Sequence, residues 1–158
     1  MWIFDRQISA NVKPIRHKLN YEHFKYVVEN CRQADNIEIG LTGFSKQTLI
    51  DLYPQLEDGL TGTEGDLPFL VAGTQVVDKE VWYWFLATPL VNSHWLRVTR
   101  EARKFVKSKL EEHKDKRHLV QVWRGHKASI TWLNILNFKE ISHYYVGNEK
   151  ILIVENRT

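Results

Sequence analysis

Two nearly continuous apolar runs dominate the hydrophobic pattern in the C-terminal half of the chain. The first covers residues 81–87 (VWYWFLA) and the second covers residues 118–123 (HLVQVW). Apolar runs of this length, rich in aromatic and β-branched residues, are typical of strands that are covered on both faces. Such strands are usually parallel and joined by a crossover helix. The pattern therefore predicts a buried central strand at 81–87 with a parallel strand at 118–123 beside it.

The segment between the two runs has the periodicity of an amphipathic helix. Apolar residues recur three or four positions apart, at Val98, Ala102, Phe105, Val106 and Leu110. Basic side chains, Lys109 among them, occupy most of the remaining positions. This spacing predicts a crossover helix over residues 93–114, with its apolar stripe facing the sheet and a basic outer face.

A second helix and a hairpin are expected after the run at 118–123. Gly125 turns the chain into a helix that closes at Leu136 or Asn137, and asparagine tolerates the left-handed conformation of a helix C-cap. Residues 138–145 and 150–155 then predict a terminal β-hairpin, which turns at Gly147-Asn148.

The first third of the chain predicts shorter elements. Residues 12–17 can form a strand, although Pro14 restricts it to a sheet edge or a bulge. Asn20 is a good N-cap for a helix over residues 21–33. Cys31 falls on the apolar stripe of that helix, where it acts as a small core residue rather than a nucleophile.

The middle of the chain is rich in glycine. Residues 40–43 (GLTG) predict a turn, after which Ser45 can cap another helix. Residues 57–66 place three glycines among four acidic residues, which indicates a mobile surface loop, because carboxylates would repel a bound phosphate. Residues 68–74 predict a strand, which pairs with 81–87 as an antiparallel hairpin through a turn that begins at Gly73.

The segment 128–138 carries a resemblance to a known family. Its sequence, ASITWLNILNF, is similar to the last helix-to-strand motif of the GNAT (Gcn5-related N-acetyltransferase) superfamily, A-x-x-L-Y-x-x-x-G-F. The longer stretch 83–145 resembles the small GNAT-like internal virion protein of short-tailed phages (podoviruses). Both have the same order of elements: an aromatic strand, a basic helix, a Val-Trp strand and an Ile-x-x-Leu helix. The resemblance implies an α/β (α+β) fold with a twisted mixed sheet, in which two central strands splay apart.

The same resemblance implies an organisation and a setting. It implies that residues 1–158 form a single GNAT-like domain. Residues 1–11, which carry Trp2 and Phe4, show no periodicity and are expected to form an extended docking arm. The implied partners are other phage particle proteins, with self-association as a further possibility. The protein is made in the host cytoplasm and resides in the virion after assembly.

Composition limits the chemistry that the chain can carry. One cysteine excludes an internal disulfide and every multi-cysteine metal site. The seven histidines form no HxxxH or HExxH pair, so no metal is expected. No apolar run reaches the roughly 18 residues needed to span a bilayer, and the N-terminus does not resemble a signal peptide. We therefore expect a soluble chain of a reducing cytoplasm without a membrane segment.

Charge is distributed unevenly along the sequence. Residues 29–80 carry ten acidic and three basic residues, whereas residues 81–158 carry fourteen basic and seven acidic residues. Two solvated faces are the simplest interpretation, although opposed charge of this size can also orient partners. Within the basic helix, Arg97, Arg100 and Lys104 are candidate contact residues for a protein partner or, less in keeping with the alternating charge, for nucleic acid.

The cofactor motif of the family has no counterpart in the chain. GNAT enzymes bind the pyrophosphate of acetyl-CoA at the turn after the central strand, where [RQ]-x-x-G-x-[GA] lets backbone N–H groups approach the phosphates. The matching segment 89–100 contains no glycine, and His94, Trp95 and Leu96 put bulk there. The weak candidates for cofactor contacts are, under the enzyme alternative, Leu86, Thr88, Asn92 and Ser93.

The catalytic residues of the family are also poorly matched. The usual general-acid tyrosine aligns with Leu133, which cannot protonate a leaving thiolate. Glu80, with Asp78 beside it, is a weak candidate for a general base ahead of the central strand. We therefore favour a non-catalytic structural protein that binds no cofactor. An acetyl-CoA-dependent N-acyltransferase and a nucleic-acid binder that uses residues 97–117 are the alternatives.

Overall fold

A computed structural model describes residues 15–56 and 58–157 of the chain. In chain order its strands, α-helices and 3-10 helices (η) are β1 (Ile15–Lys18), α2 (Tyr21–Glu29), α3 (Gln33–Leu41), α4 (Lys46–Asp51), η1 (Tyr53–Gln55), β2 (Asp58–Glu64), β3 (Leu67–Val77), β4 (Glu80–Ala87), η2 (Pro89–Ser93), α5 (Trp95–Glu112), β5 (Arg117–Trp123), α6 (Lys127–Ile135), β6 (Phe138–Val146) and β7 (Glu149–Asn156). The docking arm predicted at residues 1–11, with Trp2 and Phe4, lies outside the described residues.

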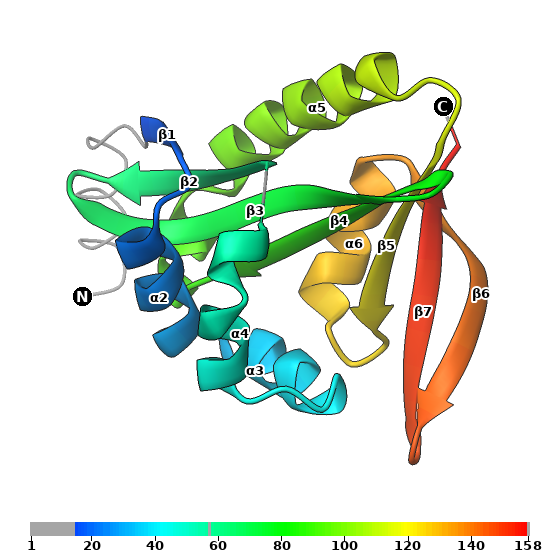
Figure 1. Cartoon of the computed structure of the whole chain (residues 1–158), viewed down its shortest axis with the longest axis horizontal. Helices are drawn as coiled ribbons and strands as arrows, with labels where there is room; N and C mark the ends of the chain where they lie inside the picture. The colour runs from blue at the N-terminus through cyan, green and yellow to red at the C-terminus, as the bar shows by residue number, and fades with distance from the viewer. Residues whose placement is uncertain (1–14, 57, 158) are drawn as a thin grey trace.

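The described strands form one mixed sheet in the order β1-β2-β3-β4-β5-β7-β6. Strand β4 is central, as predicted, and it pairs antiparallel with β3 and parallel with β5. Helix α5 connects the parallel pair and lies across one side of the sheet, while α2, α3 and α4 lie on the other (Figure 1). The terminal hairpin is also confirmed, and its second strand inserts between β5 and β6.

Side chains of β4 alternate between the two faces of the sheet. Trp84 and Leu86 pack with α2 and α4, whereas Tyr83 and Phe85 pack with residues of α5 and α6. Only Val81 and Ala87 are fully buried, and the five residues between them are partly exposed. The prediction that the whole strand is buried on both faces is therefore wrong for residues 82–86, both where β4 pairs with β5 and beyond that point.

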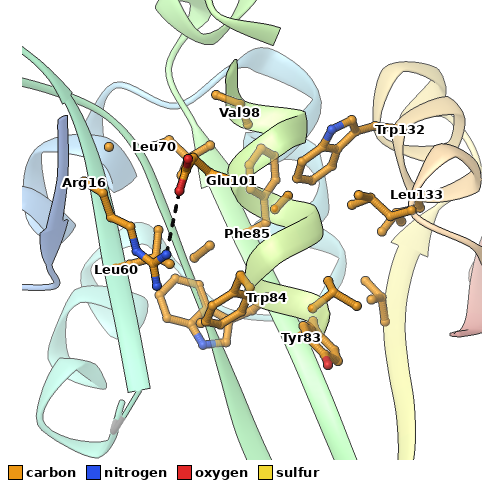
Figure 2. Close-up of a pocket in the computed structure, with 18 of the residues that line it drawn as sticks. Arg16, Leu60, Leu70, Tyr83, Trp84, Phe85, Val98, Glu101, Trp132 and Leu133 are labelled. Atoms are coloured by element: carbon orange, nitrogen blue, oxygen red, sulfur yellow. Dashed lines mark ion pairs between the residues drawn. The ribbon is translucent and has the colours of Figure 1, made fainter. Parts of the chain in front are cut away.

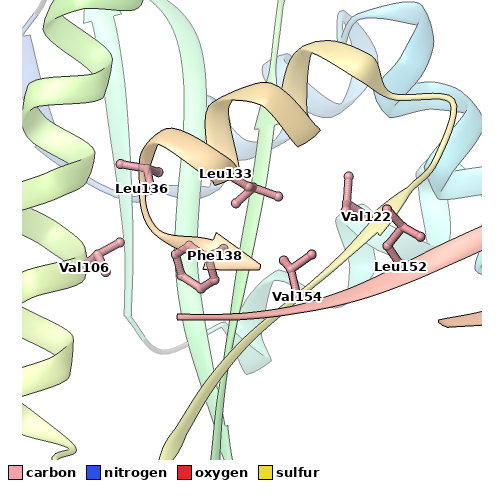
Figure 3. Packing of buried hydrophobic residues seen from close by; sticks show 7 residues of the cluster. All are labelled: Val106, Val122, Leu133, Leu136, Phe138, Leu152 and Val154. Carbon is pink, nitrogen blue, oxygen red and sulfur yellow. The ribbon is translucent and has the colours of Figure 1, made fainter. Parts of the chain in front are cut away.

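One core cluster ties the C-terminal half together. Val106 of α5, Leu133 and Leu136 of α6, and Phe138 of β6 meet Val122, Leu152 and Val154 from β5 and β7 (Figure 3). Val106 belongs to the apolar stripe that the helical spacing predicted. The chain leaves α6 through Asn137, whose φ of 68° is the left-handed conformation expected of this C-cap.

Two elements differ from the sequence prediction. Residues 58–64 form strand β2 rather than a mobile loop, because β1 and β3 supply hydrogen-bonding partners on both edges. A Cβ atom on Gly59 would lie 2.4 Å from Leu19, so the glycine allows close packing inside this strand. Strand β3 likewise continues past Gly73, and the turn falls instead at Asp78, whose φ is 52°.

The predicted helix over residues 21–33 ends early, at Glu29, and a second helix that was not predicted, α3, begins at Gln33. Asn20 caps α2 as expected, since its side chain accepts a hydrogen bond from the His23 amide. Cys31 lies in the break and is partly exposed, so it is not on the stripe of a helix. Ser45 caps α4 as predicted.

Helix α5 departs from prediction at one basic residue. Lys109 is buried and pairs with Asp58 of β2 and with Glu112, rather than facing solvent. This ion pair joins α5 to the sheet. Within the described residues, none of the helices combines the length and the apolar character needed to cross a membrane.

Candidate functional site

The parallel strands β4 and β5 separate half-way along their length. They pair from Glu80 and Arg117 as far as Tyr83 and Val120. Beyond this point β4 continues to Ala87 and β5 continues to Trp123, and no pairing between them is observed in these described segments. The opening, here called the notch, lies at the carboxyl ends of two parallel strands. Ligands of open α/β sheets bind at this kind of position.

The start of α3 holds the end of β4 at the notch. The backbone N–H of Arg32 donates to the carbonyl of Ala87 over 2.8 Å. The N–H of Ala87 in turn donates to Oδ2 of Asp35 over 3.3 Å. Asp35 is only 3% exposed, so its carboxylate satisfies a backbone donor that strand pairing leaves open.

The same carboxylate reaches across the notch to the start of α6. Asp35 Oδ1 lies 2.8 Å from Nε2 of His126. Arg32 also forms a bidentate ion pair with Asp35, in which Nε donates to Oδ2 over 2.8 Å and Nη2 donates to Oδ1 over 3.1 Å. Burial raises the pKa of Asp35, but hydrogen bonds from His126 and Arg32 outweigh this cost and hold that pKa below its usual value. The carboxylate is therefore ionised and links the end of β4 to the start of α6.

His126 and Ser129 do not form a hydrolase-type triad with Asp35. The Ser129 amide donates to Nδ1 of His126, so the ring proton is on Nε2 and is donated to Asp35. The Ser129 hydroxyl lies 3.0 Å from the same Nε2, whereas in a triad serine and aspartate contact different ring nitrogens. Nothing in this arrangement can deprotonate the hydroxyl. The two residues cap α6 instead.

Glu38 is the most perturbed titratable group beside the notch. Its Oε1 lies 3.8 Å from Nε2 of His126. Burial and the nearby charge of Asp35 raise the pKa of Glu38 to about 8, although Arg32 and the Trp123 backbone N–H act in the opposite direction. The carboxyl group is therefore largely protonated at neutral pH. It can accept a proton only in a mildly alkaline solution.

Asp35, Glu38 and His126 offer three ligand atoms that lie within 4.8 Å of one another. A metal ion would require all three at once. Both oxygens of Asp35 are already engaged by Arg32, whose Nη2 also lies 3.3 Å from Nε2 of His126. A guanidinium in this position supplies the positive charge itself and repels a second cation. We therefore interpret the cluster as a buried ion-pair network.

Aromatic side chains occupy the notch on the α5 side. The rings of Phe85 and Trp132 lie 4.8 Å apart, and those of Trp95 and Trp132 lie 5.6 Å apart. The indole N–H of Trp132 donates to the Thr99 hydroxyl over 3.0 Å. The Arg32 guanidinium covers the outer rings, 5.4 Å from Phe85 and 5.8 Å from Trp95. Side chains of four elements thus meet where the strands part.

Two cavities flank these aromatic residues. A cavity of about 260 Å³ lies between the sheet and α5. A second, of about 530 Å³, opens on the side of α2, α3 and α4 and includes Glu38 in its wall. Six residues line both: Tyr83, Trp84, Phe85, Val120, Trp132 and Leu133. These residues of β4, β5 and α6 therefore lie between the two cavities.

The turn after β4 is a 3-10 helix, η2, that leads directly into α5. The bulky residues His94, Trp95 and Leu96 follow η2, and of these only Trp95 reaches the notch. His94 is buried against Phe69 and lies 3.1 Å from Glu64, whereas Leu96 is 79% exposed. The expectation that all three would add bulk to the site is therefore wrong for His94 and Leu96.

The residues weakly predicted for cofactor contact are dispersed. Leu86 packs on the side of α2 and α4, and Thr88 is buried with its amide bonded to Phe69. Asn92 and Ser93 are exposed, and Asn92 accepts a hydrogen bond from the Trp95 indole.

The other predicted site residues lie outside the notch. Glu80 stands at the paired end of β4, where it accepts a hydrogen bond from the Trp82 indole, and Asp78 forms the turn before it. Arg97, Arg100 and Lys104 are exposed on α5. Their proposed roles in catalysis or partner contact stay predictions.

Sequence reasoning missed the residues that line the far side of the notch. Arg32, Asp35 and Glu38 recur every third position, a spacing that places charged side chains on one helical face. This repeat was the available signal for α3. His126, directly after the Gly125 turn, supplied no comparable signal, because its partner Asp35 is far away in sequence.

Comparison with solved structures identifies the architecture. The chain matches the ribosomal-protein-S18-alanine N-acetyltransferase of Escherichia coli with a TM-score of 0.66 and 16% identity, over 92% of this chain and 96% of that one. It matches a GNAT-family acetyltransferase of Bacillus anthracis with a TM-score of 0.65 and 10% identity, over 91% and 96% of the two chains. No family model matches the sequence, and no curated protein does. The chain therefore has the GNAT fold, at identities that establish the fold alone.

Proposed function

We propose that this GNAT-fold chain does not transfer acetyl groups and acts through contacts with other proteins. The observation that carries the proposal is the occupied notch. Phe85, Trp95 and Trp132 pack together where the strands part, and Arg32 and Asp35 take the backbone groups of Ala87. An extended cofactor would have to displace these side chains.

The turn that follows β4 supports the same conclusion. Phosphate groups bind closely where glycines expose successive backbone N–H groups at the start of a helix. Here no glycine occurs between Gly73 and Gly125, and α5 starts at the indole of Trp95, which is fixed by Asn92. The residues present therefore do not fit the pyrophosphate of acetyl-CoA.

The expected partners follow from the resemblance to internal virion proteins of short-tailed phages. Such a protein would be incorporated into a particle through protein contacts. The basic outer face of α5, with Arg97, Arg100 and Lys104 exposed, is available for them. Residues 1–11 remain the predicted docking arm.

Binding of acetyl-CoA tests the first part of the proposal. Ligand at 100 times its dissociation constant stabilises a protein by about 2.7 kcal/mol, which gives a measurable rise in melting temperature. We expect no shift at millimolar acetyl-CoA, whereas an active acetyltransferase of the same fold, measured in parallel, should shift. A saturable shift for this chain would contradict the proposal.

Particle incorporation tests the second part. Deletion of residues 1–10 should reduce incorporation while the melting temperature of the purified protein stays the same. Unchanged incorporation, or a collapsed melting temperature, would exclude a docking arm. A salt-sensitive gel shift with DNA or RNA would instead favour a nucleic-acid binder.

An acyltransferase is the second candidate, and one observation favours it. Glu38 borders the cavity of about 530 Å³, and its pKa of about 8 suits a general base in alkaline solution. The named structural matches are acetyltransferases. If CoA release from acetyl-CoA is detected with an amine, Glu38→Gln should abolish its rise between pH 7 and 9, while Glu140→Gln on β6 should leave it intact.

A further inference from the structure

The cavity beneath α5 is distinct from the ion-pair network at the notch. It extends from Arg16 on the edge strand β1, below the inward face of α5, as far as Trp132 on α6 (Figure 2). Its volume is about 260 Å³. Leu60, Leu70 and Phe85 form part of its floor, and Val98 and Phe105 form part of its roof.

Small side chains create this space. Ala72 on β3 lines the cavity, and so does Ala102, which interrupts the larger apolar residues on the stripe of α5. Protein interiors are normally packed to the density of organic crystals, so an apolar space of this size is an exception. A designed cavity of about 150 Å³ lined by similar residues takes up benzene. The larger cavity here has room for about ten non-hydrogen atoms by the same comparison.

The charged residues that line the cavity are Arg16, Arg97 and Glu101. Arg16 is half-exposed, and its Nη1 lies 3.8 Å from Oε2 of Glu101 on α5 (Figure 2). This ion pair is long and solvated, so it contributes little and can be exchanged readily. Arg97 also lines the wall and is exposed, so two positive charges and one negative charge border the cavity.

We infer that this cavity binds a medium-chain aliphatic carboxylate. The hydrocarbon chain enters between α5 and the sheet, where it replaces empty space with apolar contacts. The carboxylate stays at the opening and pairs with the Arg16 guanidinium, which can hold it through two parallel hydrogen bonds. The excess positive charge of the residues that border the cavity favours an acid over an amine. This site does not require the notch to bind a cofactor.

Calorimetric titration of the full chain with decanoate tests the inference. Methyl decanoate has the same hydrocarbon tail but no charge. Comparing its affinity with that of decanoate shows whether the site recognises a free carboxylate or only an acyl chain. We expect saturable binding of one decanoate, and Arg16→Gln should weaken it about tenfold, the loss of roughly one charge-assisted hydrogen bond. Methyl decanoate should bind more weakly than decanoate and should not respond to Arg16→Gln.

Two further variants locate the site. Ala102→Phe fills the cavity from α5 and should abolish binding of both ligands, with folding checked by its melting curve. Lys107→Gln removes an exposed charge from α5 outside the cavity wall and should change neither affinity. Absence of saturable decanoate binding, equal affinity for the ester, or full binding by a folded Ala102→Phe variant would each overturn the inference. If Ala102→Phe does not fold, the paired response of Arg16→Gln to the two ligands decides.

Discussion

The two ends of β4 are held in different ways. At one end, Glu80 to Tyr83 pair with β3 and β5 through regular backbone ladders. At the other end, the edge that faces β5 is held by Arg32 and Asp35 of a helix from another part of the chain. The paired end depends on backbone geometry and apolar packing. The separated end depends on charged side chains, so the two ends should respond differently to mutation and to pH.

Removal of Asp35 should have the largest effect. Asp35→Ala leaves Arg32 buried without its charge partner and the Ala87 amide without an acceptor. Breaking a buried ion pair of this kind costs about 3–5 kcal/mol of unfolding free energy. Urea denaturation measures the loss, and Asp115→Ala, an exposed substitution in the turn after α5, serves as control. Equal stability of the two variants would show that the network does not hold the separated end.

The pH dependence of stability should come largely from Glu38 above pH 4.5. Its folded pKa of about 8 lies above the ordinary value of 4.5. Its stabilising contribution is therefore complete below about pH 4.5 and is lost as pH rises towards 8. Glu38→Gln should flatten this decline and gain about 2–3 kcal/mol over the wild type at pH 8.

Asp35 contributes over a different pH range. Its pKa is lowered, so its contribution is present above about pH 4 and is lost as pH falls further. Unfolding curves at several pH values separate the two residues. The exposed variant Glu140→Gln should keep the wild-type slope between pH 5 and 8. A wild-type slope in Glu38→Gln would exclude the assignment to Glu38.

Val81→Ala tests the paired end of β4. Val81 is fully buried, and loss of two methyl groups there should cost about 2 kcal/mol. Because no titratable group is involved, the loss should be the same at pH 5 and at pH 8. A pH-dependent loss would indicate that the two ends of the strand are coupled.

The smallest expected effect concerns the side chain of Tyr83, the last residue of β4 that pairs with β5. The Tyr83 hydroxyl lies 2.7 Å from Nδ1 of His118, while Nε2 of His118 lies 3.0 Å from the His113 carbonyl. Tyr83→Phe leaves Nδ1 without a donor and should cost about 1 kcal/mol. Tyr145→Phe, on a side chain that is 60% exposed, should cost nothing measurable in the same denaturation assay.

The elements that could be predicted from the sequence are those with a local pattern of apolar residues. Strands β4 and β5, helix α5 and the terminal hairpin were predicted because each repeats a local pattern of apolar positions. Strand β2 was not, because glycines and acidic residues mask its pairing with β1 and β3. Its conformation is imposed by neighbours on both edges, which a local pattern does not record.

The candidate site was predicted only in part. The bulk of Trp95 and the absence of glycine in the turn were visible in the sequence. The network of Arg32, Asp35 and His126 was not, because its members meet only after the sheet and α3 have formed. The three-residue spacing of the charged residues indicates a helical face. It does not indicate that Asp35 contacts His126, which is ninety-one positions away in the sequence.

The insertion of β7 between β5 and β6 affects how the chain is synthesised and folded. The ribosome produces β5, α6 and β6 before β7. Until β7 is made, the outer edge of β5 is therefore unpaired. During that interval β6 is the nearest strand that could pair there wrongly, and open edges invite such pairing. Lys139 and Glu140 lie near the start of β6 and remain exposed in the finished sheet. Their charges disfavour burial beside β5 and keep that edge open until β7 arrives.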